Sequence, residues 1–453
     1  MALPAAPLAP RPLYRVAAAP RRFPGDFLVS FRRDSLGTVR RMASGGSDVT
    51  IASAGPFRLV LLNHPDLARD LFTDTSGAYH KSRALRLTKI LLGEGLLTSE
   101  APFHTRQRRL ILPAFHHQRL RAYAEAMVAR TEALASTWQD GQVLDADEAM
   151  MRLTLEIAAG TLFGADVGDD VETVRRAIAT CVELFRRTAN PLAGFFLKLP
   201  LPSTRRLNAA VADLDRVVYR VIAGRRAGHD GHTDLLAMLL AAQDEETGAG
   251  MTDQQVRDEV MTLFLAGHET TANALTWALY LLAQHPDAEA RLQAEADALG
   301  RAPSFDDLPR LPFARQVFAE ALRLYPPAWI IGRETTRAVE IGGAEVPPRS
   351  TVFVSPFLLH RDARWWDAPE VFRPERFAPG AGADRPKFAY LPFGAGRRGC
   401  IGEQFAWTEG VLVLAALAQR WRLHRADDRE VRPFPSITLR PGGPVRMRAE
   451  RRS

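Results

Sequence analysis

A single cysteine lies in a glycine-dense loop near the C-terminal end of the chain, in the segment Phe393-Gly394-Ala395-Gly396-Arg397-Arg398-Gly399-Cys400-Ile401-Gly402. Glycine permits positive φ angles and close backbone approach, so backbone N–H groups can point at the sulfur. An apolar helix is expected to begin at about Glu403, and the positive potential of its N-terminus favours the thiolate form of Cys400. A closed zinc site would need three further ligands nearby, and His360 and His424 do not supply that spacing. The loop therefore predicts a site for an anionic sulfur ligand.

The second candidate lies in the strongest helix signal of the chain, from Thr252 to His285. Thr252-x-x-Gln255 is typical of a capping box, and Pro286 ends the helix because it removes a donor. A helix of this length must cross the core. Its centre reads Ala266-Gly267-His268-Glu269-Thr270-Thr271, which places a glycine, an acid and two β-branched alcohols where packing would favour Ala or Leu. Such a local conflict indicates a functional site.

A third pattern, Glu320-Ala321-Leu322-Arg323, lies in a helix expected from Pro312 to Tyr325. Positions i and i+3 share one helix face, so the glutamate and the arginine can pair and still reach a third group. Taken alone, the pattern would be interpreted as a surface ion pair. A further arginine, Arg376, stands in Phe372-Arg373-Pro374-Glu375-Arg376-Phe377, ahead of the cysteine loop.

The elements that position these motifs are predicted from apolar spacing and turn residues. Two alternating runs between Asp48 and Leu62 are typical of a β-hairpin, and Val339–Pro356 is predicted to form short strands. From about Phe103 to Leu240 apolar residues recur at three- and four-residue spacing, which predicts helices. Neither repeats nor a Gly/Ser linker are present, so one domain is expected over residues 1–453, beginning with a Pro-rich lead at 1–24.

Composition sets the broad class. The 453 residues include 59 Lys+Arg and 52 Asp+Glu, a net charge of +7, and 46% are apolar, as in a soluble globular protein. Two cysteines exclude a disulfide scaffold, and basic residues scattered among acids argue against nucleic-acid binding. Neither a signal peptide nor an apolar run of about 18 residues is found. We expect a cytoplasmic protein without a transmembrane segment, and peripheral contact with a membrane stays open as a route for apolar substrate.

The cysteine loop fits a pattern with five fixed positions, Phe-x-x-Gly-x-Arg-x-Cys-x-Gly, met at Phe393, Gly396, Arg398, Cys400 and Gly402. This pattern closely resembles the haem-ligand loop of the cytochrome P450 family, in which a cysteine thiolate binds the haem iron. The resemblance covers roughly residues 24 to 446. It implies a mainly α fold with small β-sheets, a long central helix over the haem and a β-rich N-terminal portion. It also implies haem b as the cofactor, with Cys400 as axial ligand and with Phe393 and Gly402 among the residues that contact it.

In this family an acid and an alcohol stand side by side in the long helix above the haem, and Glu269 and Thr270 match those positions. The pair is expected to pass protons through water toward oxygen bound at the iron. Ala266 and Gly267 would line the haem, and Gly267 leaves room for dioxygen because it has no side chain. For a threonine in mid-helix, the ordinary alternative is a hydroxyl bonded back to the i−4 carbonyl.

The resemblance further implies a structural cluster and a set of haem-propionate ligands. Arg376 would join Glu320 and Arg323 in a buried cluster that holds the loop on the cysteine side of the haem. Propionates need cationic partners, and bidentate guanidinium suits them. The matching positions are His104, Arg108, Arg333 and Arg398. Arg106 and Arg109 are expected to be solvated.

By family position, five mostly apolar segments should line the substrate pocket, which indicates a bulky hydrocarbon-like substrate. The segments are Ala78–Leu97, Leu184–Leu199, Leu263–Ala266, Pro327–Ile331 and Ser436–Thr438, and the pocket side chains are expected to be Leu263, Ala266, Ala328, Trp329, Ile330 and Ile437. The stretch Glu320–Ile330 resembles bacterial β-carotene hydroxylases of the family, and Arg108–Phe115 resembles bacterial terpene oxygenases. We therefore expect a terpenoid or carotenoid hydroxylase, with β-ring hydroxylation favoured and fatty-acid hydroxylation as the near alternative.

The implied reaction is monooxygenation, in which one oxygen atom of O2 enters a C–H bond. A peroxygenase on the same fold would not need the Glu269-Thr270 pair, and a non-catalytic haem sensor would usually carry a signalling module, which is not visible. The chain has no spare cysteine cluster and no Gly-x-Gly-x-x-Gly fingerprint, so electrons must come from separate proteins. A ferredoxin with its reductase is expected, docking through an acidic face near Arg397, Lys387 and Arg385.

Overall fold

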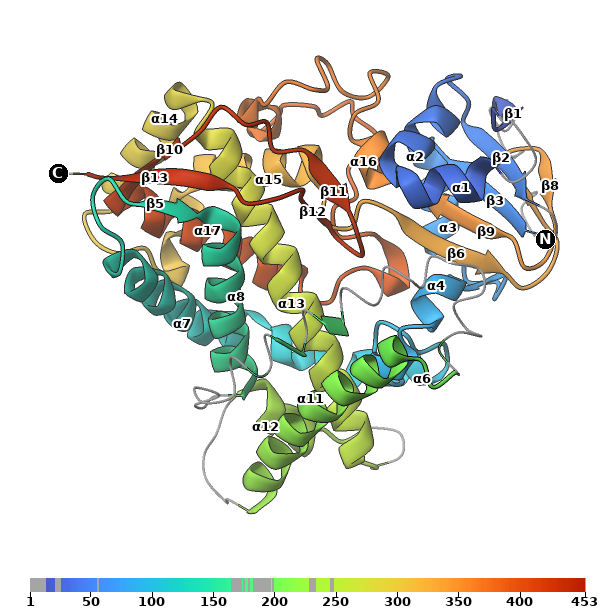
Figure 1. The fold of residues 1–453 in the computed structure, drawn as a ribbon, viewed down its shortest axis with the longest axis horizontal. Coiled ribbons are helices and arrows are strands. Elements are labelled where there is room, and N and C mark those ends of the chain that lie inside the picture. The colour runs from blue at the N-terminus through green and yellow to red at the C-terminus, as the bar shows by residue number, and fades with distance from the viewer. Residues whose placement is uncertain are drawn as a thin grey trace, which may run out of the picture.

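A long helix, α13 (Asp253–Leu282), runs through the middle of the molecule, with a sheet region on one side and the larger helical region on the other (Figure 1). The computed structural model describes residues 14–20, 26–54, 57–163, 199–227, 234–244 and 248–452, together with a few single residues between 164 and 198. The predicted architecture, mainly α with small sheets around a long central helix, is confirmed. Among these residues, no helix is both long and apolar enough to cross a bilayer.

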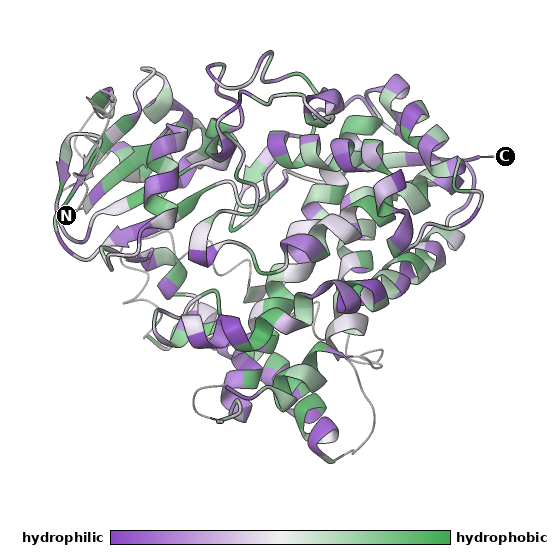
Figure 2. Ribbon diagram, turned by 180° about the vertical axis from the view of Figure 1, so that it is seen from behind, coloured by the Kyte–Doolittle hydropathy of each residue, from purple (hydrophilic) through white to green (hydrophobic). Residues whose placement is uncertain are grey.

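The helices surround α13 and vary from one turn to seven. They are α1 (Asp26–Arg33), α2 (Ser35–Ala43), α3 (Pro65–Thr73), α4 (Arg83–Arg86), α5 (Lys89–Leu92), α6 (Phe103–Ile111), α7 (His117–Ser136), α8 (Ala146–Phe163), α11 (Pro202–Ala227), α12 (Leu235–Ala241), α14 (Pro286–Asp297), α15 (Pro312–Leu324), α16 (Pro356–Leu359) and α17 (Glu403–Arg420). Figure 2 shows apolar and hydrophilic residues alternating along the peripheral helices, as expected for helices that turn one face to the core.

The largest sheet joins segments that lie far apart in the sequence. Its strands follow the order β1 (Val16–Ala18), β2 (Val49–Ala54), β3 (Phe57–Leu62), β9 (Thr351–Val354), β6 (Ile331–Thr335) and β4 (Tyr79–Lys81). Three smaller sheets contain β10 (Trp421–Arg425), β13 (Arg446–Arg451) and β5 (Val143–Asp145), then β11 (Pro433–Pro435) and β12 (Leu439–Pro441), and finally β7 (Val339–Ile341) and β8 (Ala344–Val346). β2 pairs with β3, and β7 with β8, in the antiparallel hairpins that the sequence predicts.

The N-terminus of α13 is fixed by the predicted capping box. Thr252 Oγ1 accepts a hydrogen bond from the Gln255 N–H at 3.3 Å, and Gln255 Oε1 accepts one from the Thr252 N–H at 2.8 Å. The helix ends at Leu282, earlier than predicted, because His285 is already the N-cap residue of α14 and Pro286 takes its first helical position.

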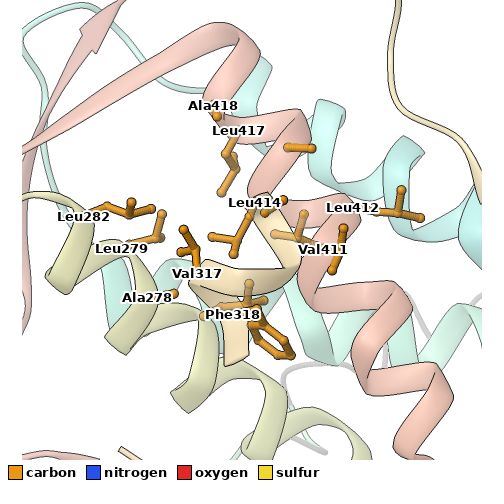
Figure 3. Close-up of a cluster of buried hydrophobic side chains, with 14 of the residues drawn as sticks. Ala278, Leu279, Leu282, Val317, Phe318, Val411, Leu412, Leu414, Leu417 and Ala418 are labelled. Carbon is orange, nitrogen blue, oxygen red and sulfur yellow. The ribbon is translucent and has the colours of Figure 1, made fainter. Parts of the chain in front are cut away.

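Apolar side chains of three helices meet in the core (Figure 3). Leu279 and Leu282 come from α13 and Phe318 from α15, and they face Leu414 and Leu417 of α17. Each fully buried side chain of this size stabilises the fold by about 1.5–3 kcal/mol. This contact matters for the site, because α13 carries the acid–alcohol segment and α17 begins directly after the cysteine loop.

A buried ion cluster ties α15 to the segment that precedes the cysteine loop. Glu320 and Arg323 form a bidentate pair, with Nε–Oε2 and Nη2–Oε1 distances of 2.7 Å. Arg376 Nε lies 3.1 Å from Glu320 Oε1, and the side chains of all three residues are 0–1% exposed. The structure thus brings together the three residues expected in this cluster.

The two guanidinium groups also satisfy backbone carbonyls of an irregular segment. Arg323 Nη1 donates to His360 O at 2.8 Å and to Pro369 O at 2.6 Å, and Arg376 Nη2 donates to Ala368 O at 2.7 Å. These carbonyls belong to a stretch without regular secondary structure, which has few backbone hydrogen bonds of its own, such as that from the Val371 N–H to Ala368 O at 3.1 Å. The cluster therefore replaces a helix or sheet as the support of this segment.

Replacing Glu320 with glutamine should destabilise the protein strongly. The change leaves two buried guanidinium groups without their anion, which costs about 3–5 kcal/mol of unfolding free energy. Denaturant unfolding measures the loss. Glu375→Gln is the matched control, because the Arg291–Glu375 pair is about half exposed and its removal should cost at most about 1 kcal/mol. Equal losses in the two variants would contradict a supporting role for the buried cluster.

Candidate active site

The cysteine loop folds back on itself and presents its thiol. The Cys400 N–H donates to Phe393 O at 2.9 Å, and the Gly399 N–H donates to Gly396 O at 3.0 Å, around a short 3-10 turn at Gly396–Arg398. Gly402 is the N-cap residue of α17, and the Cys400 side chain is exposed. The loop therefore holds the sulfur at the N-terminal end of α17, in reach of a ligand.

In its surroundings, the sulfur of Cys400 needs a positive partner to stay ionised. Although its surface is accessible, the thiol lies among enough protein atoms that burial raises its pKa to about 11, and Glu403 adds to this effect. The backbone N–H of Gly402, which donates to the sulfur, and the nearby Arg108 act in the opposite direction. A metal ion at the sulfur would complete the compensation, since a coordinating thiol is deprotonated outright. Cys181 is fully buried in an apolar cluster and offers no such site.

One glycine of the loop is required by its contact with α3. Gly396 has φ +69°, a conformation that side-chain-bearing residues rarely adopt, and a Cβ at this position would lie 2.1 Å from the carbonyl oxygen of Phe72. Glycine therefore lets the loop approach the end of α3 closely.

A cluster of cations lies near the same loop, with Glu100 as the carboxylate that pairs with it and with Glu259 interacting electrostatically with Lys81. Arg398 pairs with Glu100, and its Nη1 is buried without a hydrogen-bond partner in the described part of the chain. Lys81 Nζ donates to Leu96 O at 2.5 Å, and burial, with Arg398 second, lowers the pKa of Lys81 to about 7. The same two causes lower the pKa of Arg333 to about 10. Such a surplus of buried positive charge fits an anionic ligand such as a pair of carboxylates.

His104 and Arg108 differ in what they can offer to that ligand. Burial, followed by Lys81 and Arg398, lowers the pKa of His104 to about 4, so its imidazole is neutral at physiological pH. A neutral imidazole can still donate one hydrogen bond to a carboxylate, so the predicted contact of His104 with the propionates does not depend on its charge. Arg108 Nη1 donates to Gly399 O at 2.8 Å and thereby also supports the cysteine loop.

Lys81 and Glu100 are site residues that the sequence did not single out. Lys81 reaches the cluster because β4 pairs with β6 in a register that sets Lys81 opposite Arg333. This pairing joins residues far apart in the chain, so no local pattern indicates it. The only signal would have been a lysine in a short strand, in a chain whose basic residues are nearly all arginine.

The burial of α13 is interrupted at its centre. Ala266 is exposed, and Gly267 and Thr270 are half-buried, whereas the helix is buried on either side of them. Outside the neighbouring turns of α13, a Cβ at Gly267 would meet no atom of the described residues within 4 Å, so packing against them does not demand this glycine. Thr270 Oγ1 donates to Ala266 O at 2.6 Å, which is the i−4 bond of the ordinary alternative. Its oxygen can still accept a hydrogen bond from the accessible side.

The acid beside Thr270 is held by a different part of the chain. Glu269 is 4% exposed, and its Oε1 accepts hydrogen bonds from Thr438 Oγ1 at 2.5 Å and from Arg440 Nε at 2.9 Å. Adjacent positions on a helix do not face each other, so acid and alcohol point apart here. Thr438 and Arg440 are further site residues, and only the pocket segment at 436–438 came near to predicting them.

Four of the expected pocket side chains have accessible surface. Ala266 is exposed, Ile437 is 49% exposed, and Ala328 and Ile330 are half-buried. The expected segment Leu184–Leu199 lies almost entirely outside the described residues.

Two expected pocket side chains are core residues instead. Trp329 is 3% exposed, stacks on Phe31 with ring centroids 6.5 Å apart, and donates from Nε1 to Ser436 O at 3.0 Å. This corrects the prediction of a pocket-lining indole, because its apolar face and its N–H are both already satisfied. Leu263 is 8% exposed and belongs to the buried cluster that includes Leu96.

Arg106 and Arg109 are likewise not simply solvated. Both pair with Asp244, which is 1% exposed, at distances of 3.4 Å from Arg106 Nε and 2.7 Å from Arg109 Nη2. They link α6 to the segment that follows α12, because a buried carboxylate needs cationic partners.

Comparisons with known proteins agree with this geometry. Residues 38–445 match the family model described as Cytochrome P450. The chain is 42% identical over 414 residues to the cyclooctatin synthase of Streptomyces melanosporofaciens, covering 89% of each protein, and 35% identical over 419 residues to the pentalenene oxygenase of Streptomyces avermitilis, covering 90% of this chain and 92% of that protein. The crystal structure of the cytochrome P450DA heme domain superimposes with a TM-score of 0.87 at 27% identity, covering 98% of this chain and 99% of that chain.

The chain belongs to the cytochrome P450 family. It is a cytochrome P450 monooxygenase whose cofactor is haem b, with Cys400 as the axial thiolate ligand. The residues present fit this cofactor, because the loop presents Cys400 beside the Gly402 N–H and because one guanidinium nitrogen of the cation cluster has no hydrogen-bond partner among the described residues.

Gly396→Ala should lower haem incorporation. Beyond the cost of about 1–3 kcal/mol for a non-glycine residue at this φ, the Cβ would collide with the Phe72 carbonyl and displace the cysteine loop. The ratio of haem to protein after purification measures the effect. Gly380→Ala is the control, since Gly380 has φ +80° but no atom within 4 Å of an added Cβ, and this variant should keep its haem. Full haem content in Gly396→Ala would refute the requirement for close approach.

Proposed function

We propose that this monooxygenase hydroxylates a cyclic terpenoid. The observation that carries the proposal is similarity over nearly the whole chain to two terpene-related members of the family, cyclooctatin synthase and pentalenene oxygenase. The accessible apolar surface supports it, because Ala266, Ala328, Ile330 and Ile437 offer aliphatic contacts to a rigid hydrocarbon.

A carotenoid substrate, with hydroxylation of its β-ring, is the second candidate. It rests on the stretch Glu320–Ile330, in which Glu320 and Arg323 serve the buried ion cluster and Trp329 packs in the core. That stretch therefore bears more on the fold than on the substrate, and the terpenoid is the better-supported choice.

Cofactor binding is assigned to three sets of groups. Cys400 is the iron ligand, and Phe393 and Gly402 shape its loop from either side. Arg398 and Arg333 would bind the haem propionates, with hydrogen bonds from neutral His104 and with Arg108 supporting the loop. Lys81 extends the same cluster. When bound, the haem supplies the activation of dioxygen and the attack on the C–H bond, and electron donation from the thiolate favours O–O cleavage.

The protein's part in the reaction is to exclude bulk water and to move protons. Thr270 keeps its hydroxyl hydrogen on Ala266 O, so its oxygen can hold a water by accepting a hydrogen bond from it. Glu269 is the acid that would resupply protons to that position through water. Gly267 keeps the helix surface open beside it.

Electrons are proposed to come from a ferredoxin and its reductase. Lys387 and Arg397 are exposed on the cysteine side of the site and can attract an acidic protein. Arg385 is a weaker candidate than expected, because its guanidinium stacks on Trp366 at 3.8 Å and donates to Trp365 O at 3.3 Å.

A substrate panel tests the terpenoid assignment. Spin-state titrations of the ferric protein should show a cyclic terpene binding at least about tenfold more tightly than a long-chain fatty acid, a difference of about 1.4 kcal/mol. The reason is that the fatty acid brings a carboxylate to a surface of aliphatic side chains. β-Carotene is the third member of the panel, and mass spectrometry identifies the products. Preferential binding and oxidation of the fatty acid or of β-carotene would overturn the assignment.

Thr270→Ala should separate electron consumption from product formation. Without the hydroxyl, protons reach the bound oxygen poorly, so product per electron should fall several-fold while hydrogen peroxide rises. Thr276→Ala is the control, because Thr276 makes the same i−4 bond, to Ala272 O at 2.8 Å, but is fully buried. Unchanged product yield in Thr270→Ala would remove Thr270 from the proton route.

A further inference from the structure

A short loop between α5 and α6 lies directly on the first half of α13. Gly95 approaches the helix so closely that a Cβ at this position would lie 2.1 Å from Thr262 Oγ1. Beside it, Glu259 Oε2 accepts a hydrogen bond from the Leu96 N–H at 2.9 Å. A carboxyl group of α13 therefore holds the loop by its backbone, and the seating of the loop on the helix does not depend on a side chain of the loop itself.

The carbonyl side of Leu96 is held by a second buried side chain. Lys81 Nζ donates to Leu96 O at 2.5 Å, and Lys81 is itself fixed in β4, where its backbone N–H donates to Glu100 Oε1 at 2.6 Å. Leu96 is thus bonded at its N–H to α13 and at its carbonyl to β4. Two such bonds leave this residue little freedom to turn, so they also fix the direction in which the next residue, Leu97, points.

Leu97 is the side chain that this arrangement presents. It is 40% exposed, whereas Leu96 before it and Thr98 after it are 8% and 0% exposed. Leu97 also ends the first of the five segments expected to line the substrate pocket. Its peptide bond with Leu96 contains the carbonyl that Lys81 of the cation cluster holds. An exposed leucine in this place offers an aliphatic contact to a hydrocarbon substrate.

Packing alone does not explain an acid at position 259. Glu259 is 0% exposed, and its Oε1 has no hydrogen-bond partner in the described part of the chain, which costs stability. Its neighbours on α13, Val260 and Leu263, belong to a buried apolar cluster, where an apolar side chain would pack without this cost. Burial raises the pKa of Glu259 to about 8, so the carboxyl group is largely protonated at neutral pH. The hydrogen bond to Leu96 is the role that the structure leaves for this acid.

We propose that Glu259 is a positioning residue: through the Leu96 peptide it fixes the Leu97 side chain against the substrate, and it thereby decides which carbon of the substrate is oxidised. The proposal rests on the terpenoid hydroxylation proposed above and adds a residue that controls its regiochemistry. A cyclic hydrocarbon skeleton is oriented mainly by apolar contacts. A shift of one contacting leucine therefore changes the C–H bond that is presented to the oxidant, since reactivity depends on close positioning.

Hydrogen–deuterium exchange tests the hydrogen bond without turnover. In haem-loaded Glu259→Leu the Leu96 N–H loses its acceptor, so this amide should exchange about fivefold faster, the factor that corresponds to about 1 kcal/mol for one hydrogen bond. Mass spectrometry of fragmented peptides from residues 93–99 measures the rate. Glu259→Gln should exchange like wild type, because its amide oxygen can accept the same bond and its side chain replaces a largely neutral acid. Unchanged exchange in Glu259→Leu would overturn the proposal.

The ratio of products oxidised at different carbons tests the consequence for the reaction. This ratio should change several-fold in Glu259→Leu and keep its wild-type value in Glu259→Gln. Glu289→Leu is the matched control, because Glu289 in α14 is also a buried acid that accepts a leucine N–H, from Leu423 at 3.2 Å. The control should keep the product ratio. A purely structural role of Glu259 would lower the total yield without changing the ratio, and that result would contradict the proposal.

Leu97→Ala completes the comparison. It should change the product ratio by itself, and Glu259→Leu should add nothing to that change, because Glu259 acts through this side chain. An unchanged ratio in Leu97→Ala, or additive changes in the double variant, would overturn the proposal. Leu97→Ala decides even if Glu259→Leu does not fold, since Leu97 is exposed. If wild type oxidises no terpenoid, the function proposed above fails, whereas the exchange comparison still decides whether Glu259 holds the loop.

Discussion

An anionic sulfur inside a protein needs positive partners: with burial as the largest cause, the pKa of Cys400 is raised to about 11. The chain meets part of this need with a backbone N–H from Gly402, at the N-terminal end of α17, and with Arg108 nearby. Haem iron meets the rest. Three features keep this sulfur accessible and beside these partners. They are the glycine-dense loop, the packing of α17 on α13 and α15, and the contact of Gly396 with α3.

The same problem of buried charge recurs through the molecule with different solutions. Glu320 neutralises two fully buried guanidinium groups and lets them hold an irregular segment by its carbonyls. Around Arg398 the balance is reversed, since cations outnumber the carboxylate of Glu100, and the surplus suits an anionic cofactor. At Glu269 the carboxyl group has one partly exposed arginine, Arg440, and the hydroxyl of Thr438 as its donors. The cluster at Glu320 stabilises an irregular segment, whereas the cations around Arg398 suit a ligand.

Local patterns predicted what depends on local geometry. The capping box at Thr252, the hairpins and the cysteine loop follow from short-range preferences, and the family resemblance supplied the distant partner Arg376. What the sequence missed depends on long-range register or on burial. Lys81 joins the site through its pairing opposite Arg333, and Arg440 through a hairpin packed on α13. The sequence singled out His104 and Trp329, but it could not show how deeply each is buried. Burial lowers the pKa of His104, and it makes Trp329 a core residue.

The absorption spectrum of the reduced, purified protein with carbon monoxide tests the assignment of Cys400 most directly. An axial thiolate donates electron density to the iron, so a strongly red-shifted Soret band is predicted for wild type, and Cys400→His should lose that shift while keeping the fold. Cys181→Ser is the control and should keep the shifted band. An unshifted band from a fresh, folded wild-type preparation would contradict thiolate ligation by Cys400 and, with it, the monooxygenase chemistry derived for this site.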